Sequence, residues 1–168
     1  MKIEIWTDGS SRGNPGKGGW GSIIITKDEV IELGGSDKMT TNNKMELLAS
    51  IEGLKEIEGN IIKETKEVTV CTDSQYVKKG MTEWIDGWIA KDWKGSTKKP
   101  VMNQDLWKAL KKEEDRLKNS GIKIIWKYVK AHCGIALNER ADEIATMLAD
   151  GHNVELYRGD RSGYNIVF

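Results

Sequence analysis

Cysteine is scarce in this chain of 168 residues, and long hydrophobic runs are absent. Cys71 and Cys133 lack metal-ligand spacing, and two lone thiols indicate a reducing, cytoplasmic setting. No stretch approaches the roughly 20 apolar residues that a membrane span needs, which predicts no membrane partner. Residues 1–8 alternate like a strand and lack the apolar core of a signal peptide. Nothing in the pattern demands a dimer, so we expect a monomer.

The chain also lacks net charge, because 26 basic residues balance 26 acidic ones. Enzymes that act on nucleic acid are often basic, so any electrostatic footprint on this protein must be local. One such region runs from Lys91 to Lys112, where seven lysines and two aspartates give a local charge of +5. Lysines placed near phosphates favour binding because counterions are released.

Hydrophobic periodicity predicts three strands followed by helices that alternate with strands. The expected strands are residues 1–8, 20–26, 30–34, 68–72 and 122–129, and the expected helices are 42–58, 74–80, 103–119 and 139–150. This order predicts an α/β fold with one mixed five-stranded sheet, three antiparallel strands and then parallel strands, flanked by helices. We expect residues 84–100 to be irregular and the polar tail, residues 151–168, to be partly mobile.

Carboxylates occur where the expected elements end or begin. Asp8 and Asp73 each follow a threonine and an apolar strand, so parallel neighbouring strands would bring both to one sheet edge. Glu46 and Asp142 fall in early turns of expected helices, where the helix dipole alone would stabilise an acid. Two unpaired carboxylates side by side repel unless cations hold them. Oxygen-rich clusters suit Mg²⁺ or Mn²⁺, and two ions about 4 Å apart would activate water against a phosphodiester.

His132 lies in the loop between the last expected strand and the last expected helix. A loop histidine is more often a surface residue than a catalytic one. Its place at the same sheet edge as the acids nevertheless favours a role in moving protons near neutral pH.

Five short blocks resemble the bacterial type 1 ribonuclease H family (ribonuclease HI) over almost the whole chain. They are TDGS with GNPG at 7–16, TTNNKMEL at 40–47, TDSQYV at 72–77, VKAH at 129–132 and NERAD at 138–142. Each block alone is moderately specific, but five in the right order are very specific.

The resemblance implies an RNase H-like fold with the catalytic domain over residues 1–150. It implies hydrolysis of the RNA strand of an RNA/DNA hybrid by two metal ions, which leaves 3′-hydroxyl and 5′-phosphate ends. The implied cofactors are two Mg²⁺ ions, for which Mn²⁺ can substitute. The implied metal ligands are Asp8, Glu46, Asp73 and Asp142. His132 would assist proton transfer or product release.

The resemblance also implies a set of substrate contacts. Asn14, Asn42, Asn43 and Gln75 would face the RNA strand, where short amides can read a 2′-hydroxyl as donor and acceptor. N-capping of the following helix is an alternative role for the two neighbouring asparagines. The implied contacts to the DNA strand are Trp84, Trp88, Lys94, Lys98 and Lys99 in a basic protrusion, and Thr41 and Asn103 in a phosphate pocket. Trp84 and Trp88, four residues apart, could equally pack a helix into the core.

Three positions depart from the family pattern. Met39 stands where some relatives place an arginine in the phosphate pocket, so a guanidinium anchor is missing there. Ala131 precedes His132 where relatives often have glycine, and Cys133 follows it. The loop around His132 is therefore expected to be set differently.

Three other functions remain as alternatives. The chain could hold a hybrid without cutting it, although clustered acids near phosphates would not help a pure binder. It could be a nuclease of the same fold that acts on DNA, but the tandem Asn42–Asn43 and the tryptophan-lysine protrusion favour a hybrid. It could also be a structural domain that a metal stabilises without catalysis.

Overall fold

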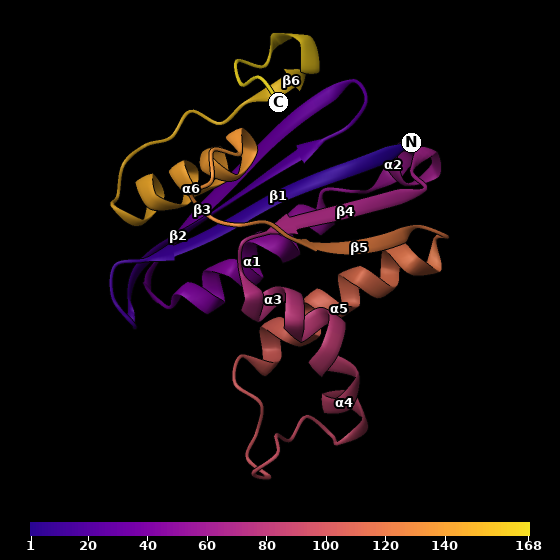
Figure 1. Cartoon of the computed structure of the whole chain (residues 1–168), viewed down its shortest axis with the longest axis vertical. Helices are drawn as coiled ribbons and strands as arrows, with labels where there is room; N and C mark the ends of the chain where they lie inside the picture. Colours follow the sequence, from indigo (N-terminus) through magenta and orange to yellow (C-terminus); the bar gives the residue numbers. More distant parts are fainter.

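The computed structural model describes residues 1–168 and contains one mixed sheet with helices on both faces (Figure 1). The strands are β1 (Lys2–Ser11), β2 (Gly16–Ile25), β3 (Glu29–Thr40), β4 (Glu67–Thr72), β5 (Lys123–Tyr128) and β6 (Arg158–Asp160). Their order across the sheet is β5-β4-β1-β2-β3-β6. β1, β2 and β3 form an antiparallel meander, while β4 runs parallel to β1 and to β5. The mixed sheet is confirmed, with six strands rather than the expected five.

The helices are α1 (Asn42–Lys55), α2 (Gly59–Glu64), α3 (Gln75–Lys79), α4 (Ile85–Ala90), α5 (Gln104–Asn119) and α6 (Ala136–Ala149). A π-helical turn, Gly80–Trp84, joins α3 to α4, and a short 3₁₀ turn, Arg161–Gly163, follows β6. The prediction that residues 84–100 are irregular is therefore wrong for the first part of this segment, which is helical. None of these helices combines the length and the apolar character that a bilayer crossing requires.

Alternation along the strands divides the core into two layers. Ile3 and Ile5 of β1 point into a large cluster that includes the apolar faces of α1 and α5. Trp6 points to the opposite face, where Ile144 belongs to the apolar side of α6. Figure 1 shows α1 and α5 on one side of the sheet and α6 on the other. Burying each such large apolar side chain stabilises the fold by roughly 1.5–3 kcal/mol, so both faces of the sheet are held firmly.

The β1–β2 hairpin is longer than the sequence indicated. Its strands pair from Glu4↔Ile25 to Ser11↔Gly18, so much of the glycine-rich stretch is strand rather than loop. β3 likewise continues to Thr40, although the apolar alternation fades after residue 34. Glycines and polar residues weaken a strand signal, and here the backbone bonds to a neighbouring strand supply what the side chains do not.

Two helix starts also differ from expectation. Thr41 caps α1, because its Oγ1 accepts a hydrogen bond from the Lys44 backbone N–H at 3.3 Å, so the capping role considered for the asparagines is wrong. α6 begins at Ala136, three residues earlier than expected. Glu46 is consequently the fifth residue of its helix and Asp142 the seventh, so the helix dipole alone does not explain Asp142.

The C-terminal tail is attached to the sheet. β6 pairs antiparallel with the start of β3, from Glu29↔Asp160 to Ile31↔Arg158. The rings of Tyr157 and Tyr164 pack at a tilt of 52°, with their centroids 5.1 Å apart. Hydrophobic periodicity does not predict this strand, because three residues are too few for a detectable period and the partner strand lies far away in the chain.

Candidate active site

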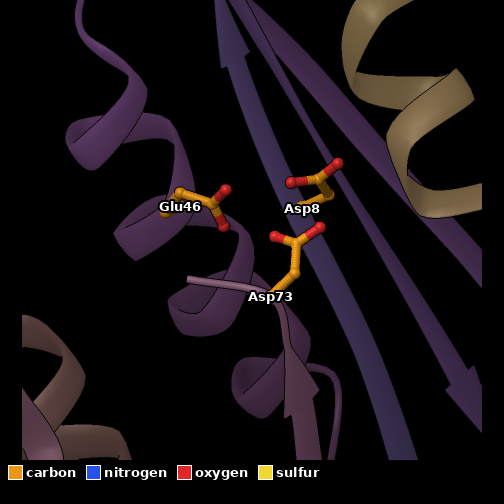
Figure 2. A group of neighbouring side chains, drawn as sticks. All are labelled: Asp8, Glu46 and Asp73. Carbon is orange, nitrogen blue, oxygen red and sulfur yellow. The ribbon is translucent and has the colours of Figure 1, made fainter. Parts of the chain in front are cut away.

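Three carboxylates from three different elements meet at one sheet edge. Ligand oxygens of Asp8, Glu46 and Asp73 all lie within 4.8 Å of one another. Asp73 directly follows β4, and Asp8 is one residue past Thr7↔Thr72, the last pair between β1 and β4. Figure 2 shows the three side chains pointing into one space, with Glu46 reaching in from α1. The expected meeting of Asp8 and Asp73 at parallel strand ends is thus present.

A glycine brings Glu46 into reach. A Cβ atom on Gly9 would overlap the backbone nitrogen of Glu46 and come within 2.8 Å of the Met45 Cβ. β1 can pass this close to the backbone of α1 only because residue 9 has no side chain. The residue that follows Asp8 therefore sets the distance between Asp8 and Glu46.

A second glycine places Asp142. Gly21 pairs with Asp8 across the hairpin, and a Cβ on it would come within 2.7 Å of the Ala141 carbonyl oxygen. α6 therefore lies directly on β2 beside Asp8, and the next helical residue, half-buried Asp142, joins the acids. Asp142 stands outside the tight group of three but is near enough to raise the pKa of Asp8.

Burial dominates the electrostatics of the acid cluster. It raises the pKa of Asp8, and the negative charges of Glu46 and Asp73 raise it further. Burial likewise raises the pKa of Glu46. Glu46 Oε2 is buried and has no hydrogen-bond partner. Burying a carboxylate oxygen without a hydrogen-bond partner costs free energy. This cost indicates that the site is built to receive a positively charged partner. A set of donors made only of carboxylate oxygens suits a hard divalent cation, and Asp8, Glu46 and Asp73 could hold one.

Asn138 is a member of this site that the sequence reading did not single out. It is a buried residue of α6, and its Nδ2 donates a hydrogen bond to Asp73 Oδ2 at 3.2 Å. This bond ties Asp73, which follows β4, to α6. The only sequence signal was its place four residues before Asp142, which puts both on one face of a helix.

His132 is exposed in the loop between β5 and α6. Its backbone is left-handed, with φ of 55°, and no hydrogen bond or ion pair holds its side chain. Gly134, two residues on, is also left-handed at φ of 78°. The structure does not bring the imidazole into the acid cluster, and its role stays a prediction.

The side-chain amides that we expect to face the RNA strand are all exposed, and each lies only a few residues from Asp8, Glu46 or Asp73 in the sequence. Asn42 Oδ1 accepts a hydrogen bond from the Ser11 backbone N–H at 2.6 Å, which ties the β1–β2 hairpin to α1. Because the carbonyl side is used, the Nδ2 group of Asn42 is left as a donor for a ligand. Asn14, Asn43 and Gln75 have no side-chain hydrogen bond within the protein.

The protrusion combines exposed lysines with a packed aromatic cluster. Lys94, Lys98 and Lys99 are exposed and form no ion pairs. Trp88 is half-buried, with its ring centroid 5.2 Å from that of Trp107, whereas Trp84 remains 39% exposed. Trp88 therefore packs the helix against the core, as one interpretation of the spacing expected, while the contact of Trp84 with a substrate stays a prediction.

The two members of the expected phosphate pocket come from different elements. Thr41 is engaged as the cap of α1. Asn103 precedes α5 with a left-handed backbone, φ of 58°, and its Nδ2 donates to the Tyr76 hydroxyl at 3.1 Å. Met39, at the position of the missing arginine, is 66% exposed. No contact within the protein joins Thr41 to Asn103, and their pocket stays a prediction.

Known proteins resemble this chain over most of its length. The family model for RNase H matches residues 1–150. The chain belongs to the RNase H family. It is 47% identical over 148 residues to the ribonuclease H of Pseudomonas entomophila, covering 88% of this chain and 93% of that protein. It is 48% identical over 160 residues to the ribonuclease H of Geotalea uraniireducens, covering 95% and 98%. The chain is therefore an enzyme, a hydrolase of the ribonuclease H type.

Solved structures show the same fold. LC9-RNase H1, a type 1 RNase H with the type 2 active-site motif, is 28% identical with a TM-score of 0.70 over 99% of this chain and 76% of that one. The N-terminal RNase H domain of Rv2228c from Mycobacterium tuberculosis is 27% identical with a TM-score of 0.65, covering 90% and 95%. LC11-RNase H1 in complex with an RNA/DNA hybrid is 24% identical with a TM-score of 0.60, covering 89% and 97%.

Proposed function

We propose that this ribonuclease H cuts the RNA strand of RNA/DNA hybrids with two Mg²⁺ ions, leaving 3′-hydroxyl and 5′-phosphate ends. The convergence of Asp8, Glu46 and Asp73, with a buried Glu46 oxygen that lacks any partner, carries the proposal. Membership of the RNase H family and a relative of the same fold in complex with a hybrid support the substrate. We also propose a cytoplasmic monomer.

Four carboxylates would hold the ions: Asp8, Glu46, Asp73 and Asp142. Divalent ions in such a site supply an activated water and charge stabilisation for the leaving oxygen. The water oxygen forms a bond to phosphorus while the bond from phosphorus to the 3′ oxygen breaks. The attacking water would lose a proton to solvent, and the 3′ oxygen would take up a proton and leave as a hydroxyl. His132, which is exposed in the β5–α6 loop and has no side-chain hydrogen bond, would carry protons near the site.

Side chains around the acids would select the substrate. The Asn42 amide, fixed by the Ser11 N–H, would donate to a 2′-hydroxyl, and Asn14, Asn43 and Gln75 would contribute further contacts on the RNA strand. Lys94, Lys98 and Lys99 would neutralise phosphates of the DNA strand, and Trp84 would offer its exposed ring to that strand. Thr41 and Asn103 would bind a DNA phosphate without help from an arginine at residue 39.

Cleavage of end-labelled substrates tests the function. The RNA strand of a hybrid should be cut with Mg²⁺ and left whole with EDTA, while duplex DNA should survive both. The downstream product should accept a 5′ label only after phosphatase treatment. Equal cutting of duplex DNA would favour a DNA nuclease, and binding without cutting would favour a hybrid-binding module.

A chimeric strand tests whether the amides read sugars. A single ribonucleotide within DNA should be cut far less well than a run of several, because each lost 2′-hydroxyl contact costs about 1 kcal/mol. Equal rates on the two substrates would remove the recognition role from Asn14, Asn42, Asn43 and Gln75.

A further inference from the structure

Arg140 belongs to a second polar centre, on the other side of α6 from the acids. Asn138 and Asp142 lie four residues apart on one face of the helix, whereas Arg140 is turned about 200° from each. Its guanidinium donates to Glu32 of β3 from Nε at 2.7 Å and from Nη2 at 2.9 Å. α6, which carries Asn138 and Asp142, is thus bonded to β3 through the face that is turned away from the acids.

The C-terminal tail completes this centre. The Tyr164 hydroxyl donates to Glu32 Oε2 at 2.6 Å, and the Tyr157 backbone N–H donates to Glu32 Oε1 at 2.9 Å. Arg140 Nη2 also donates to the Glu155 carbonyl at 3.1 Å. Figure 1 shows the tail leaving the end of α6 and running back along the sheet to β6 beside β3. The Glu32 side chain is only 1% exposed, so the carboxylate is both buried and surrounded by donors.

The start of α6 needs such an anchor, because the only other side-chain bond that ties it to the sheet is the one from Asn138 to Asp73, within the site itself. Its N-cap residue, Ile135, offers no capping group. The loop before it contains two left-handed residues, His132 and Gly134, and makes no side-chain hydrogen bonds. Arg140 sits in the second turn, between Asn138 and Asp142, and joins this part of the helix to the sheet over a separation of 108 residues.

We infer that Arg140, held by Glu32 and by Tyr164 of the tail, is a positioning residue that sets Asn138 and Asp142 against the acid cluster. Displacement of the second turn would loosen the Asn138 bond to Asp73 and withdraw the Asp142 charge from Asp8. The tail, residues 151–168, lies outside the stretch that the family model matches, so the Glu32 centre joins that stretch to a segment beyond it. The inference rests on the proposed metal-dependent function.

Titration of the metal-free protein with Mn²⁺ by calorimetry tests the inference without any turnover. Arg140→Lys keeps the charge but loses the two-point contact, and it should weaken Mn²⁺ binding about threefold to tenfold, toward the range seen for groups that orient metal ligands. Tyr164→Phe removes one hydroxyl and should shift the affinity in the same direction by less. In the Arg140→Lys background, Tyr164→Phe should add little, because both act through Glu32.

Arg116→Lys is the matched control. Arg116 of α5 is also held by three groups, since it donates to Glu113 at 2.8 Å and to the backbone carbonyls of Ile57 and Leu54, and none of these is a member of the acid cluster. The Arg116→Lys substitution should lower thermal stability and leave Mn²⁺ affinity unchanged. All variants are titrated at a temperature where circular dichroism shows them folded.

Unchanged Mn²⁺ affinity in Arg140→Lys, or an equal loss in Arg116→Lys, would overturn the inference and leave the centre a purely structural one. Should Arg140→Lys fail to fold, Tyr164→Phe alone decides the matter by the same measurement. Failure of the proposed function looks different: the wild-type protein would bind Mn²⁺ and yet leave a hybrid uncut.

Discussion

Two buried carboxylate centres flank α6, and they are opposite in their hydrogen bonding. At Glu32, four donated hydrogen bonds from Arg140, Tyr157 and Tyr164 surround one carboxylate. At the acid cluster, Asp8, Glu46 and Asp73 crowd together with no basic side chain among them, and one Glu46 oxygen has no partner. The first centre is complete in the protein alone. The second is completed only by something positive from outside, which is what distinguishes a structural carboxylate from a functional one.

The pKa shifts repeat this contrast. Burial raises the pKa of Glu32, but hydrogen bonds from Arg140, Tyr164 and Tyr157 outweigh it, so the net pKa is lowered. At Asp8, burial and the neighbouring acids act in the same direction, and the pKa is raised. A similar burial thus has opposite outcomes because the partners differ.

Loss of one charge from the acid cluster should have the largest effect. Asp73→Asn is nearly isosteric and keeps an acceptor for Asn138, so the fold should survive while kcat falls by about a thousandfold or more. Hybrid affinity should hold or rise, because repulsion of phosphates decreases. Single-turnover cleavage at matched folding measures this. Activity within about tenfold of wild type would sink the metal-ligand role of Asp73.

Neutralising one carboxylate in each centre compares them directly. Glu32→Gln leaves the half-buried Arg140 with only Glu143 as a charge partner, and it should cost about 3 kcal/mol of unfolding free energy because four hydrogen bonds converge on the buried Glu32 carboxylate. Glu46→Gln removes a charge that the metal-free protein cannot compensate, so it should leave stability equal or higher. Urea unfolding in EDTA measures both. Equal destabilisation by the two substitutions would mean that the acid cluster is satisfied in a way the contacts do not show.

The pH dependence of stability should differ in sign between the centres. Because folding raises the pKa of Asp8 and Glu46 above their ordinary values of 3.8 and 4.5, the folded metal-free protein holds protons that the unfolded chain has released, and this contribution is lost as pH rises above that range. Because folding lowers the pKa of Glu32, its contribution is present above pH 4.5 and is lost as pH falls below it.

Unfolding in EDTA across pH 3 to 9 checks the signs, with Asp8→Asn and Glu32→Gln each removing one arm of the profile. Adding Mg²⁺ should restore stability mainly at the alkaline end, where the acids are free to bind it. A metal-free profile that keeps rising with pH would contradict the raised pKa of the cluster.

The smallest effects on activity are expected from substitutions in the protrusion, which contributes no residue to either carboxylate centre. Replacing Lys94, Lys98 and Lys99 by alanine should raise KM and leave kcat nearly unchanged, the sign of lost uniform binding. The slope of log affinity against log salt should flatten by roughly two to three units. Lys2, Lys27 and Lys123 lie at the other end of the strands and are exposed, so their triple alanine variant is the control. Equal slopes in the two variants would show that the protrusion lysines do not touch the hybrid.

Much of the active site was predictable because its signals are local. An apolar strand that ends in Thr7–Asp8 or Thr72–Asp73 predicts a carboxylate at a strand end. The block around Glu46 resembles the family in eight consecutive residues. Alternation and three-residue spacing likewise predicted five strands and the main helices. Where such signals fade, at the glycines of the β1–β2 hairpin and beyond residue 34 of β3, the expected elements came out too short.

The amino-acid sequence by itself determined which residue types are available for chemistry. It also determined most of the strands and helices, because their periodicity depends on neighbours within one or two turns of chain. Only the tertiary structure decided that Asn138 supports Asp73, that Gly9 and Gly21 allow the close backbone approaches around Asp8, and that the tail reaches Glu32. These contacts join residues 37 to 132 positions apart. No local periodicity records such pairs, since their partners are chosen by how the two faces of the sheet are covered.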